Sequence, residues 1–177
     1  MTELTTKRLE LRRWLETDLD EHAAMIADPE VNRYVGGPTD RASAWRQIAC
    51  FIGHRELRGW TSSVVVERRS GRMVGRAGLW RPEGYPDVEV GWILKPIVWN
   101  QGYATEIGRA VRDYAFGTLG IPHLISLIHP GNQGSIRVAQ KIGASFEGEY
   151  VFNGAPHLIY GQDSPSHDAN PKPVTTP

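Results

Sequence analysis

The chain has little cysteine, no excess of charge of either sign and no long apolar run. Its one cysteine, Cys50, excludes an intramolecular disulfide and is expected to be buried within a helix. Twenty basic and twenty acidic residues cancel, and no block rich in Lys and Arg indicates a nucleic-acid partner. No apolar run approaches the roughly 18 residues of a transmembrane helix. These absences predict a protein of the reducing cytoplasm that binds neither nucleic acid nor membrane.

Both ends of the chain lack particular features: residues 1–4 have no signal-peptide pattern, and residues 163–177 have few apolar residues. Residues 1–4 lack the basic and apolar segments of a signal peptide, so no secretion is expected. Residues 163–177 contain four prolines and no large apolar residue except Val174. Such a composition cannot bury a core, which predicts a disordered tail. Residues 1–162, with ordinary hydrophobic and charged content, are predicted to form a single domain.

Hydrophobic periodicity predicts a mixed α/β (α+β) domain. A helix capped by Thr39 or Asp40 is expected to end at Gly59, and another is expected to begin at Thr17 or Asp18. Asn153-Gly154 is a strong hairpin signal. Strands are expected at residues 7–14, 60–67, 73–80, 88–94, 123–128, 146–152 and 156–160, and helices at about 17–27, 40–58, 103–119 and 135–142. This order predicts a mixed sheet with helices on both faces.

A strand, a turn of small residues and a helix follow one another between residues 88 and 119. The free amides and the positive dipole end of such a helix form an anion site, and Gly102 and Ala104 let a pyrophosphate approach the backbone. A second strand-to-helix junction follows at residues 132–135. Two junctions on neighbouring strands predict a phosphate-bearing cofactor at a sheet opening; a packing turn is the alternative. The pattern matches neither a P-loop nor a dinucleotide fingerprint.

Three motifs resemble the acetyl-CoA-dependent N-acetyltransferases of the GNAT superfamily, in particular its RimJ/RimL-like branch. They are Glu89-Val90-Gly91-Trp92, Trp99-Asn100-Gln101-Gly102-Tyr103-Ala104-Thr105-Glu106, and Asn132-x-x-Ser135 followed by Lys141-x-Gly143. Similarity continues upstream at residues 6–12 and 28–34, so roughly residues 5–161 are covered. The resemblance implies a GNAT-type fold with a largely antiparallel sheet that splays in the middle. It also implies direct acetyl transfer from acetyl-CoA to an amine in a ternary complex.

The resemblance also implies roles for particular residues. Glu89 becomes the general base, commonly acting through water, although a structural pair with Arg76 is equally open. A backbone N–H near Ile93 or Leu94 becomes the oxyanion donor. The residues expected to bind the cofactor are Ile93, Leu94, Gln101, Gly102, Tyr103, Ala104, Thr105, Asn132 and Ser135. Asn132 is equally well explained as a plain helix cap.

Two positions depart from the family pattern. Trp99 occupies the first position of the cofactor motif, and Ala139 stands where many members have the tyrosine that protonates the leaving thiolate. Ser135 or water would then act as the acid, or none is needed. The missing tyrosine keeps open an alternative, a catalytically silent CoA-binding or scaffold protein.

The sequence does not decide whether the acceptor is a protein N-terminus or a small-molecule amine. It also leaves open whether the protein forms a homodimer. Balanced charge argues mildly against a polycationic acceptor. Aromatic residues either line the acceptor pocket or pack in the core: Tyr34, Trp45, Trp60, Trp80 and Tyr160. The six histidines show no metal-ligand spacing, so no metal is expected.

Overall fold

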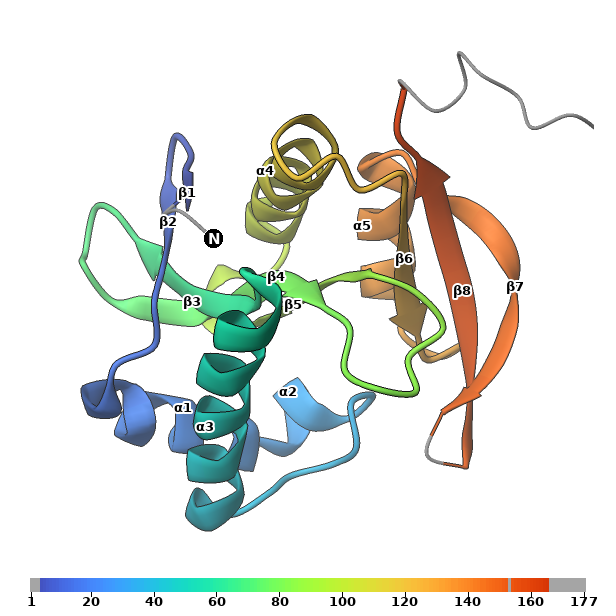
Figure 1. The fold of residues 1–177 in the computed structure, drawn as a ribbon. Helices are drawn as coiled ribbons and strands as arrows, with labels where there is room; N and C mark the ends of the chain where they lie inside the picture. The colour runs from blue at the N-terminus through green and yellow to red at the C-terminus, as the bar shows by residue number, and fades with distance from the viewer. Residues whose placement is uncertain (1–3, 153, 166–177) are drawn as a thin grey trace, which may run out of the picture.

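A single eight-stranded sheet forms the centre of the molecule (Figure 1). The structure is a computed structural model and describes residues 4–152 and 154–165. The strands are β1 (Leu4–Thr5), β2 (Leu9–Arg12), β3 (Ser62–Glu67), β4 (Met73–Trp80), β5 (Glu89–Leu94), β6 (His123–Ile128), β7 (Ser145–Phe152) and β8 (Ala155–Asp163). Their order is β1-β2-β3-β4-β5-β6-β8-β7. Every neighbouring pair is antiparallel except β5 and β6, which are parallel. The mixed, largely antiparallel sheet is confirmed.

Helices cover both faces of this sheet, as expected (Figure 1). The α-helices are α1 (Leu19–Ala27), α2 (Pro29–Asn32), α3 (Arg41–Arg58), α4 (Tyr103–Gly117) and α5 (Gln133–Lys141), and two short 3₁₀ turns are η1 (Glu16–Asp18) and η2 (Pro96–Val98). The first three α-helices lie on one face, whereas α4 and α5 lie on the other. The strand β1 and both 3₁₀ turns were not anticipated from the sequence.

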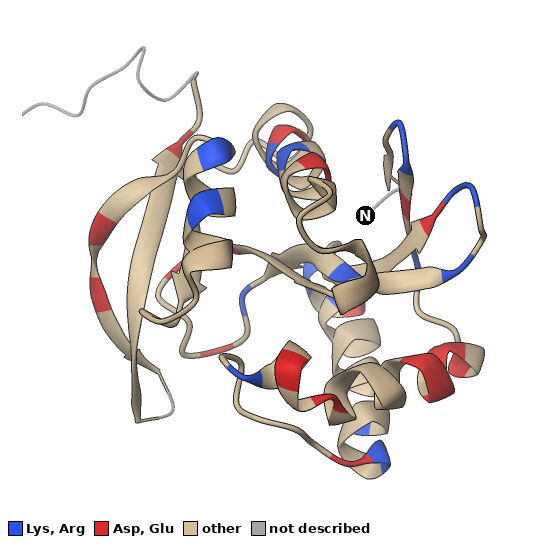
Figure 2. Ribbon diagram, turned by 180° about the vertical axis from the view of Figure 1, so that it is seen from behind, with Lys and Arg blue, Asp and Glu red and all other residues tan. Residues whose placement is uncertain are grey.

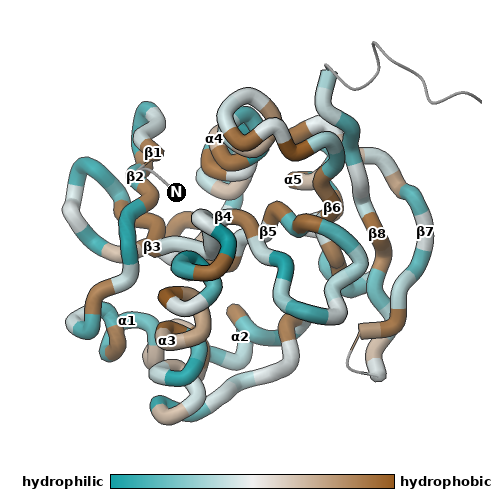
Figure 3. Tube along the Cα trace, viewed as in Figure 1, coloured by the Kyte–Doolittle hydropathy of each residue, from teal (hydrophilic) through white to brown (hydrophobic). Residues whose placement is uncertain are grey.

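Two large apolar cores lie on opposite faces of the sheet, and a smaller one lies beneath α5. On one face, α4 buries Ile107 and Val111 against alternate residues of β4 and β5 such as Leu79 and Val90. On the other face, α1 and α3 pack residues such as Phe51 against Val64 and Val66 of β3. The hydrophobic colouring accordingly follows the central strands and part of α4 (Figure 3). This period-two alternation separates the side chains of β5 into two sets, and that separation places the site.

Helix ends follow the sequence signals at α3 but not at α1. The Asp40 carboxylate accepts from the Ser43 N–H at 2.8 Å, and Gly59 ends α3 with φ 79°. Asp18 occupies the N-cap of α1 but makes no side-chain cap bond. Its carboxylate instead accepts from Arg12 at 2.7 Å and from the Leu15 N–H at 2.9 Å. Asp18 therefore joins β2 to the α1 region, because Arg12 offers its carboxylate two charge-assisted hydrogen bonds at once.

The parallel strands β5 and β6 separate after one pair, Glu89 with Ile125. The Ile125 N–H donates to the Val88 carbonyl at 2.9 Å. One step further along, the Ser126 hydroxyl donates to the Val90 carbonyl at 2.7 Å, where a backbone N–H would continue the ladder. A side chain therefore occupies the next acceptor, and the predicted splay is confirmed.

The C-terminal boundary lies further along the chain than predicted. Strand β8 includes Asp163, and Ser164 is buried with its N–H donating to the Pro122 carbonyl at 2.8 Å. The remainder of the expected tail, residues 166–177, lies outside the described residues, as does Asn153 of the hairpin turn. Phe152 and Ala155 pair across that turn, so the hairpin is where it was predicted. No helix in the described part of the chain has the length and apolar character needed to span a bilayer.

Candidate active site

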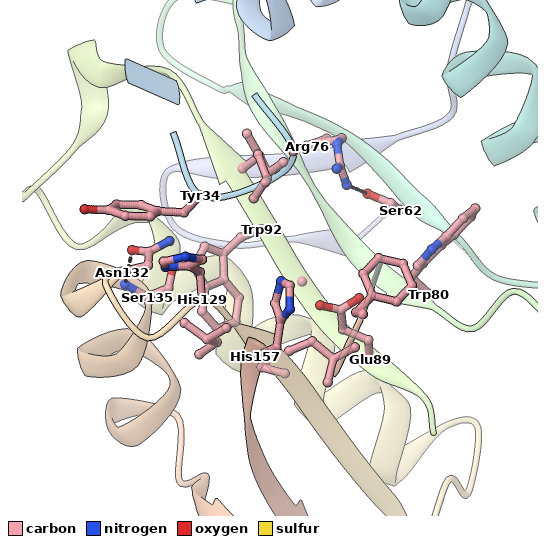
Figure 4. Close-up of a pocket in the computed structure, with 18 of the residues that line it drawn as sticks. Tyr34, Ser62, Arg76, Trp80, Glu89, Trp92, His129, Asn132, Ser135 and His157 are labelled. Atoms are coloured by element: carbon pink, nitrogen blue, oxygen red, sulfur yellow. Dashed lines mark hydrogen bonds between the residues drawn. The ribbon is translucent and has the colours of Figure 1, made fainter. Parts of the chain in front are cut away.

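Two clefts meet where the sheet splays. One, of about 530 Å³, lies on the side of Glu89 and is here called the acceptor-side cleft. The other, of about 470 Å³, lies at the N-termini of α4 and α5 and is here called the cofactor-side cleft. Seven residues line both: Arg33, Tyr34, Val35, Trp92, Ile93, Asn132 and Ser135. Figure 4 shows Trp92 and His157 between Glu89 on one side and Asn132 with Ser135 on the other. A group passed between two bound molecules would lie at this junction.

The first turn of α4 lines the cofactor-side cleft. Gly102 is the N-cap, and no side chain caps this helix. Gly102 has φ 77°, a left-handed conformation that L side chains rarely adopt. The cleft is lined by Gly102, Tyr103, Ala104 and Thr105. Gln101 does not line it; its side chain donates to the Ile97 carbonyl at 2.8 Å and stabilises the turn instead.

The charge of the cofactor-side cleft suits a phosphate-bearing molecule. Its charged lining residues are Glu30, Arg33, Arg137 and Lys141. Two of the three cations come from α5, on which the basic residues are visible in Figure 2. Basic side chains beside an uncapped helix N-terminus therefore supply both parts of an anion site.

Arg8 holds the α4 turn from outside the cleft, a contact not anticipated from the sequence. Its guanidinium donates to Glu106 at 2.6 Å and to the Gln101 carbonyl at 2.8 Å, and it lies 4.2 Å from the centre of the Tyr103 ring. Thr6 also donates to Glu106, at 2.6 Å. These contacts join residues about 100 positions apart, so local patterns could not reveal them. They fix the turn whose amides line the cleft.

Asn132 is a helix cap, as the alternative interpretation predicted, and it also lines both clefts. Its side-chain oxygen accepts from the Ser135 N–H at 3.0 Å at the start of α5. This hydrogen bond satisfies one of the free backbone N–H groups at the N-terminus of α5. The cap leaves its amide nitrogen free to act on a ligand, so the two roles are compatible.

We expect Asn132→Ala to cost about 1 kcal/mol of unfolding free energy, the usual worth of a cap, in chemical denaturation. Asp40→Ala, which removes the cap of α3 far from the clefts, is the matched control. If Asn132 also contacts the cofactor, CoA affinity measured by calorimetry will fall in Asn132→Ala but not in Asp40→Ala. Equal affinities in both variants would leave Asn132 with a capping role alone.

The floor of the acceptor-side cleft includes a glycine of β5, Gly91. Gly78 of β4 pairs with Gly91 of β5, and two residues away on either side Trp80 pairs with Glu89 and Arg76 pairs with Ile93. All these positions lie on the face of the sheet covered by α1 and α3. This agrees with the prediction that Glu89, Gly91 and Ile93 share one face. Because Gly91 has no side chain, the cleft stays open beside the Glu89 carboxyl group, which lies 3.7 Å from where a β-carbon at Gly91 would be.

The Glu89 carboxyl group has a strongly perturbed pKa. Burial raises this pKa to about 7, while the backbone N–H of Leu127 and the Arg76 charge lower it by smaller amounts. The splay of β6 leaves the Leu127 N–H available to this carboxylate. A carboxyl group with a pKa near 7 can accept a proton at neutral pH and release it again.

The alternative interpretation of Glu89 as the structural partner of Arg76 has little support from geometry. Among the described residues no ion pair of 4.0 Å or less joins them; Arg76 instead donates to Ser62 at 3.1 Å. A close structural pair would lower the pKa of the carboxyl group, whereas the Glu89 pKa is raised.

The backbone of β5 directs alternate N–H groups into the gap. The Val88 carbonyl faces β6, and the Lys95 N–H donates to β4 at 2.8 Å. Because successive residues point to opposite sides of a strand, the N–H of Leu94 faces the gap and that of Ile93 faces β4. Both residues line the cofactor-side cleft, but only Leu94 has an amide suitably directed for an oxyanion there.

The position of the missing tyrosine is closed to solvent. Ala139 is 0% exposed in the small core beneath α5, so it borders neither cleft. Ser135 borders both, as does Tyr34, which packs between His129, with ring centres 5.2 Å apart, and Gly131. Tyr34 is thus a second hydroxyl at the junction.

The other proposed aromatic residues divide between the cleft and the rest of the molecule. Trp80 lines the acceptor-side cleft, as does Tyr34. Trp45 is exposed, and Trp60 and Tyr160 pack against apolar cores. His129 and His157, which the sequence marked only as strand-end residues or not at all, line the cleft. Cys50 is exposed at its edge, so the expectation of a buried cysteine was wrong.

The comparisons with known proteins agree with this geometry. The family model described as an acetyltransferase (GNAT) domain matches residues 8–145. The Bacillus subtilis protein YkkB, itself uncharacterized, is 31% identical over 166 residues, which are 92% of this chain and 96% of that protein. An acetyltransferase from Agrobacterium tumefaciens has a TM-score of 0.83 and 29% identity, with 92% and 94% of the two chains covered. RimL, a ribosomal L7/L12 N-acetyltransferase solved with coenzyme A, has a TM-score of 0.77 at 16% identity, covering 91% and 97%.

Proposed function

The chain belongs to the GNAT acetyltransferase family, and from this premise we propose that it transfers an acetyl group from acetyl-CoA directly to a primary amine. The observation that carries the proposal is the meeting of two clefts at the split between β5 and β6. One cleft has an uncapped helix N-terminus with basic side chains, and the other has a carboxyl group with a pKa near 7. Direct transfer requires both molecules to be bound at once, which this arrangement allows.

The cofactor's pyrophosphate is proposed to bind the amides of residues 102–105, with Arg137 and Lys141 adding charge. Glu89 accepts the proton of the incoming ammonium, directly or through water. The Leu94 N–H then stabilises the developing oxyanion, in preference to that of Ile93. For the leaving thiolate we assign Ser135, Tyr34 or water as the proton donor, unless the thiolate leaves without one. The branch we propose is the RimJ/RimL-like one, in keeping with RimL among the structural neighbours.

Thiol release from acetyl-CoA over a panel of primary amines tests this function. We expect amine-dependent release of one thiol per acetyl group transferred, with no acetylated enzyme isolated when the amine is omitted. Binding of CoA by calorimetry without thiol release for any amine would instead support a catalytically silent CoA-binding protein, the alternative kept open by Ala139.

A further inference from the structure

The acceptor-side cleft contains an arginine whose charge no close carboxylate balances. Arg76 projects from β4 onto the face that carries Glu89, with its guanidinium carbon 5.1 Å from the centre of the Phe51 ring. Within residues 4–152 and 154–165, its guanidinium donates only to the neutral hydroxyl of Ser62, at 3.1 Å. Its Nε is buried and has no hydrogen-bond partner among the described residues. A cation held this way is costly unless something else satisfies it.

Glu89 balances this charge only in part. Because burial raises the pKa of its carboxyl group to about 7, Glu89 is neutral in a large fraction of molecules near neutral pH. It becomes fully neutral when it takes a proton from the substrate. The charged residues that line the cleft are Arg33, Arg76 and Glu89, so cations exceed anions. A polycationic amine would add further positive charge to a cleft that already has an excess.

Aromatic side chains form much of the remaining wall. Trp80, Tyr85 and Phe152 line the acceptor-side cleft near the end of β5 that carries Glu89. The centres of the Tyr85 and Phe152 rings are 5.1 Å apart. These surfaces suit an apolar or aromatic substituent. Along β4, Arg76 lies four residues from Trp80, about 13 Å at the strand rise, and both side chains line the acceptor-side cleft.

We propose that the acceptor is an amine that also carries a carboxylate and an apolar or aromatic side chain, of the size of a free amino acid. Its carboxylate binds the Arg76 guanidinium, its amine faces Glu89, and its side chain lies against the aromatic wall. This inference rests on the proposed function, since it names the substrate of that same cleft. It makes Arg76 a specificity-determining residue.

Matched acceptor pairs test the inference: phenylalanine with 2-phenylethylamine, leucine with 3-methylbutylamine, and tryptophan with tryptamine. The members of a pair differ only in the carboxylate. In the wild-type protein we expect the amino acid to have the higher kcat/KM, by about 10- to 100-fold, the worth of a charge-assisted bond. In Arg76→Met, which keeps the apolar stem, that ratio should fall by a similar factor. Comparing ratios cancels the different basicities of the two amines.

Arg72→Met, an exposed arginine in the turn between β3 and β4, is the matched control and should leave the ratio unchanged. Thermal melts establish that both variants are folded. A readout that needs no transfer is inhibition or thermal stabilisation by 3-phenylpropanoate, which has the carboxylate but no amine. Arg76→Met should weaken its binding by about 10- to 100-fold.

Each outcome separates this inference from the proposed function. Thiol release with equal ratios in wild type and Arg76→Met would overturn the carboxylate inference while leaving amine acetylation intact. Faster turnover of spermidine or of peptides with free N-termini than of any amino acid would do the same. Binding of 3-phenylpropanoate that depends on Arg76, together with no thiol release for any pair, would retain the carboxylate site and overturn the proposed function.

Discussion

Glu89→Gln is expected to lower kcat by roughly 10²–10⁴, the usual worth of a general base. The amide keeps the shape of the side chain and one acceptor for the Leu127 N–H, but it cannot take a proton. The wild-type rate should rise with pH through about 7, where the carboxyl group titrates, and the variant should lose this ascending limb. CoA affinity should barely change, because Glu89 does not line the cofactor-side cleft. Steady-state rates from pH 5 to pH 9, beside calorimetry with CoA, measure both effects.

Stability over the same pH range provides an independent check on Glu89. Its folded pKa of about 7 lies above the ordinary value of 4.5, so the carboxyl group stabilises the folded state below pH 4.5 relative to higher pH. That advantage is lost as the pH rises through 7, at a cost of roughly 1–3 kcal/mol. Glu89→Gln avoids the cost, so it should melt higher than wild type at pH 8 and about equally at pH 4.5. A variant that is less stable at pH 8 and fully active would indicate a structural Glu89–Arg76 pair.

Gly102→Val is expected to weaken CoA binding by about 100-fold. The glycine has φ 77° and ψ 9°, and a β-branched residue is strained there. Its new side chain would also meet the Arg8 guanidinium, which lies 3.6 Å from the position of the added carbon. The turn must move to relieve the strain, and the amides of residues 103–105 move with it. Calorimetric titration with CoA measures the loss.

Gly59→Val is a matched control for this prediction, because Gly59 has φ 79° and ψ −6° at the end of α3, outside both clefts. The two variants should lose similar stability, but only Gly102→Val should lose CoA affinity. Unchanged affinity in a folded Gly102→Val protein would show that these amides do not bind the pyrophosphate.

Local patterns predicted the parts of the molecule that depend on nearby residues. The alternation along β5 was sufficient to place Glu89, Gly91 and Ile93 on one face. The Asp40 cap and the Gly59 stop were equally visible, because a capping bond spans only three residues. The GNAT-type fold, with its splayed sheet, followed from the motifs and is confirmed.

The features that the sequence did not reveal depend on residues distant in the chain. Thr17 or Asp18 was expected to cap α1, yet the Asp18 carboxylate accepts hydrogen bonds from Arg12 of β2, whose approach no local pattern encodes. The same is true of Arg8 against Glu106 and of Arg76, which was considered only as a partner of Glu89. Tyr34 was one of several aromatic candidates for the acceptor pocket, and it borders the junction because α2 and the turn after it fold back towards Gly131. The position of β6 was needed to identify Leu94, rather than Ile93, as the residue whose N–H faces the gap.

The Ser126 hydroxyl and the Glu89 carboxylate have a consequence for the timing of binding. Both occupy backbone groups that would otherwise join β5 to β6, namely the Val90 carbonyl and the Leu127 N–H. The pairing of β5 with β6 therefore cannot continue beyond this point in the free protein, and a ligand does not have to separate the two strands. The opening between the strands forms during folding. The rate of ligand binding should therefore be governed by diffusion and charge rather than by a conformational opening step.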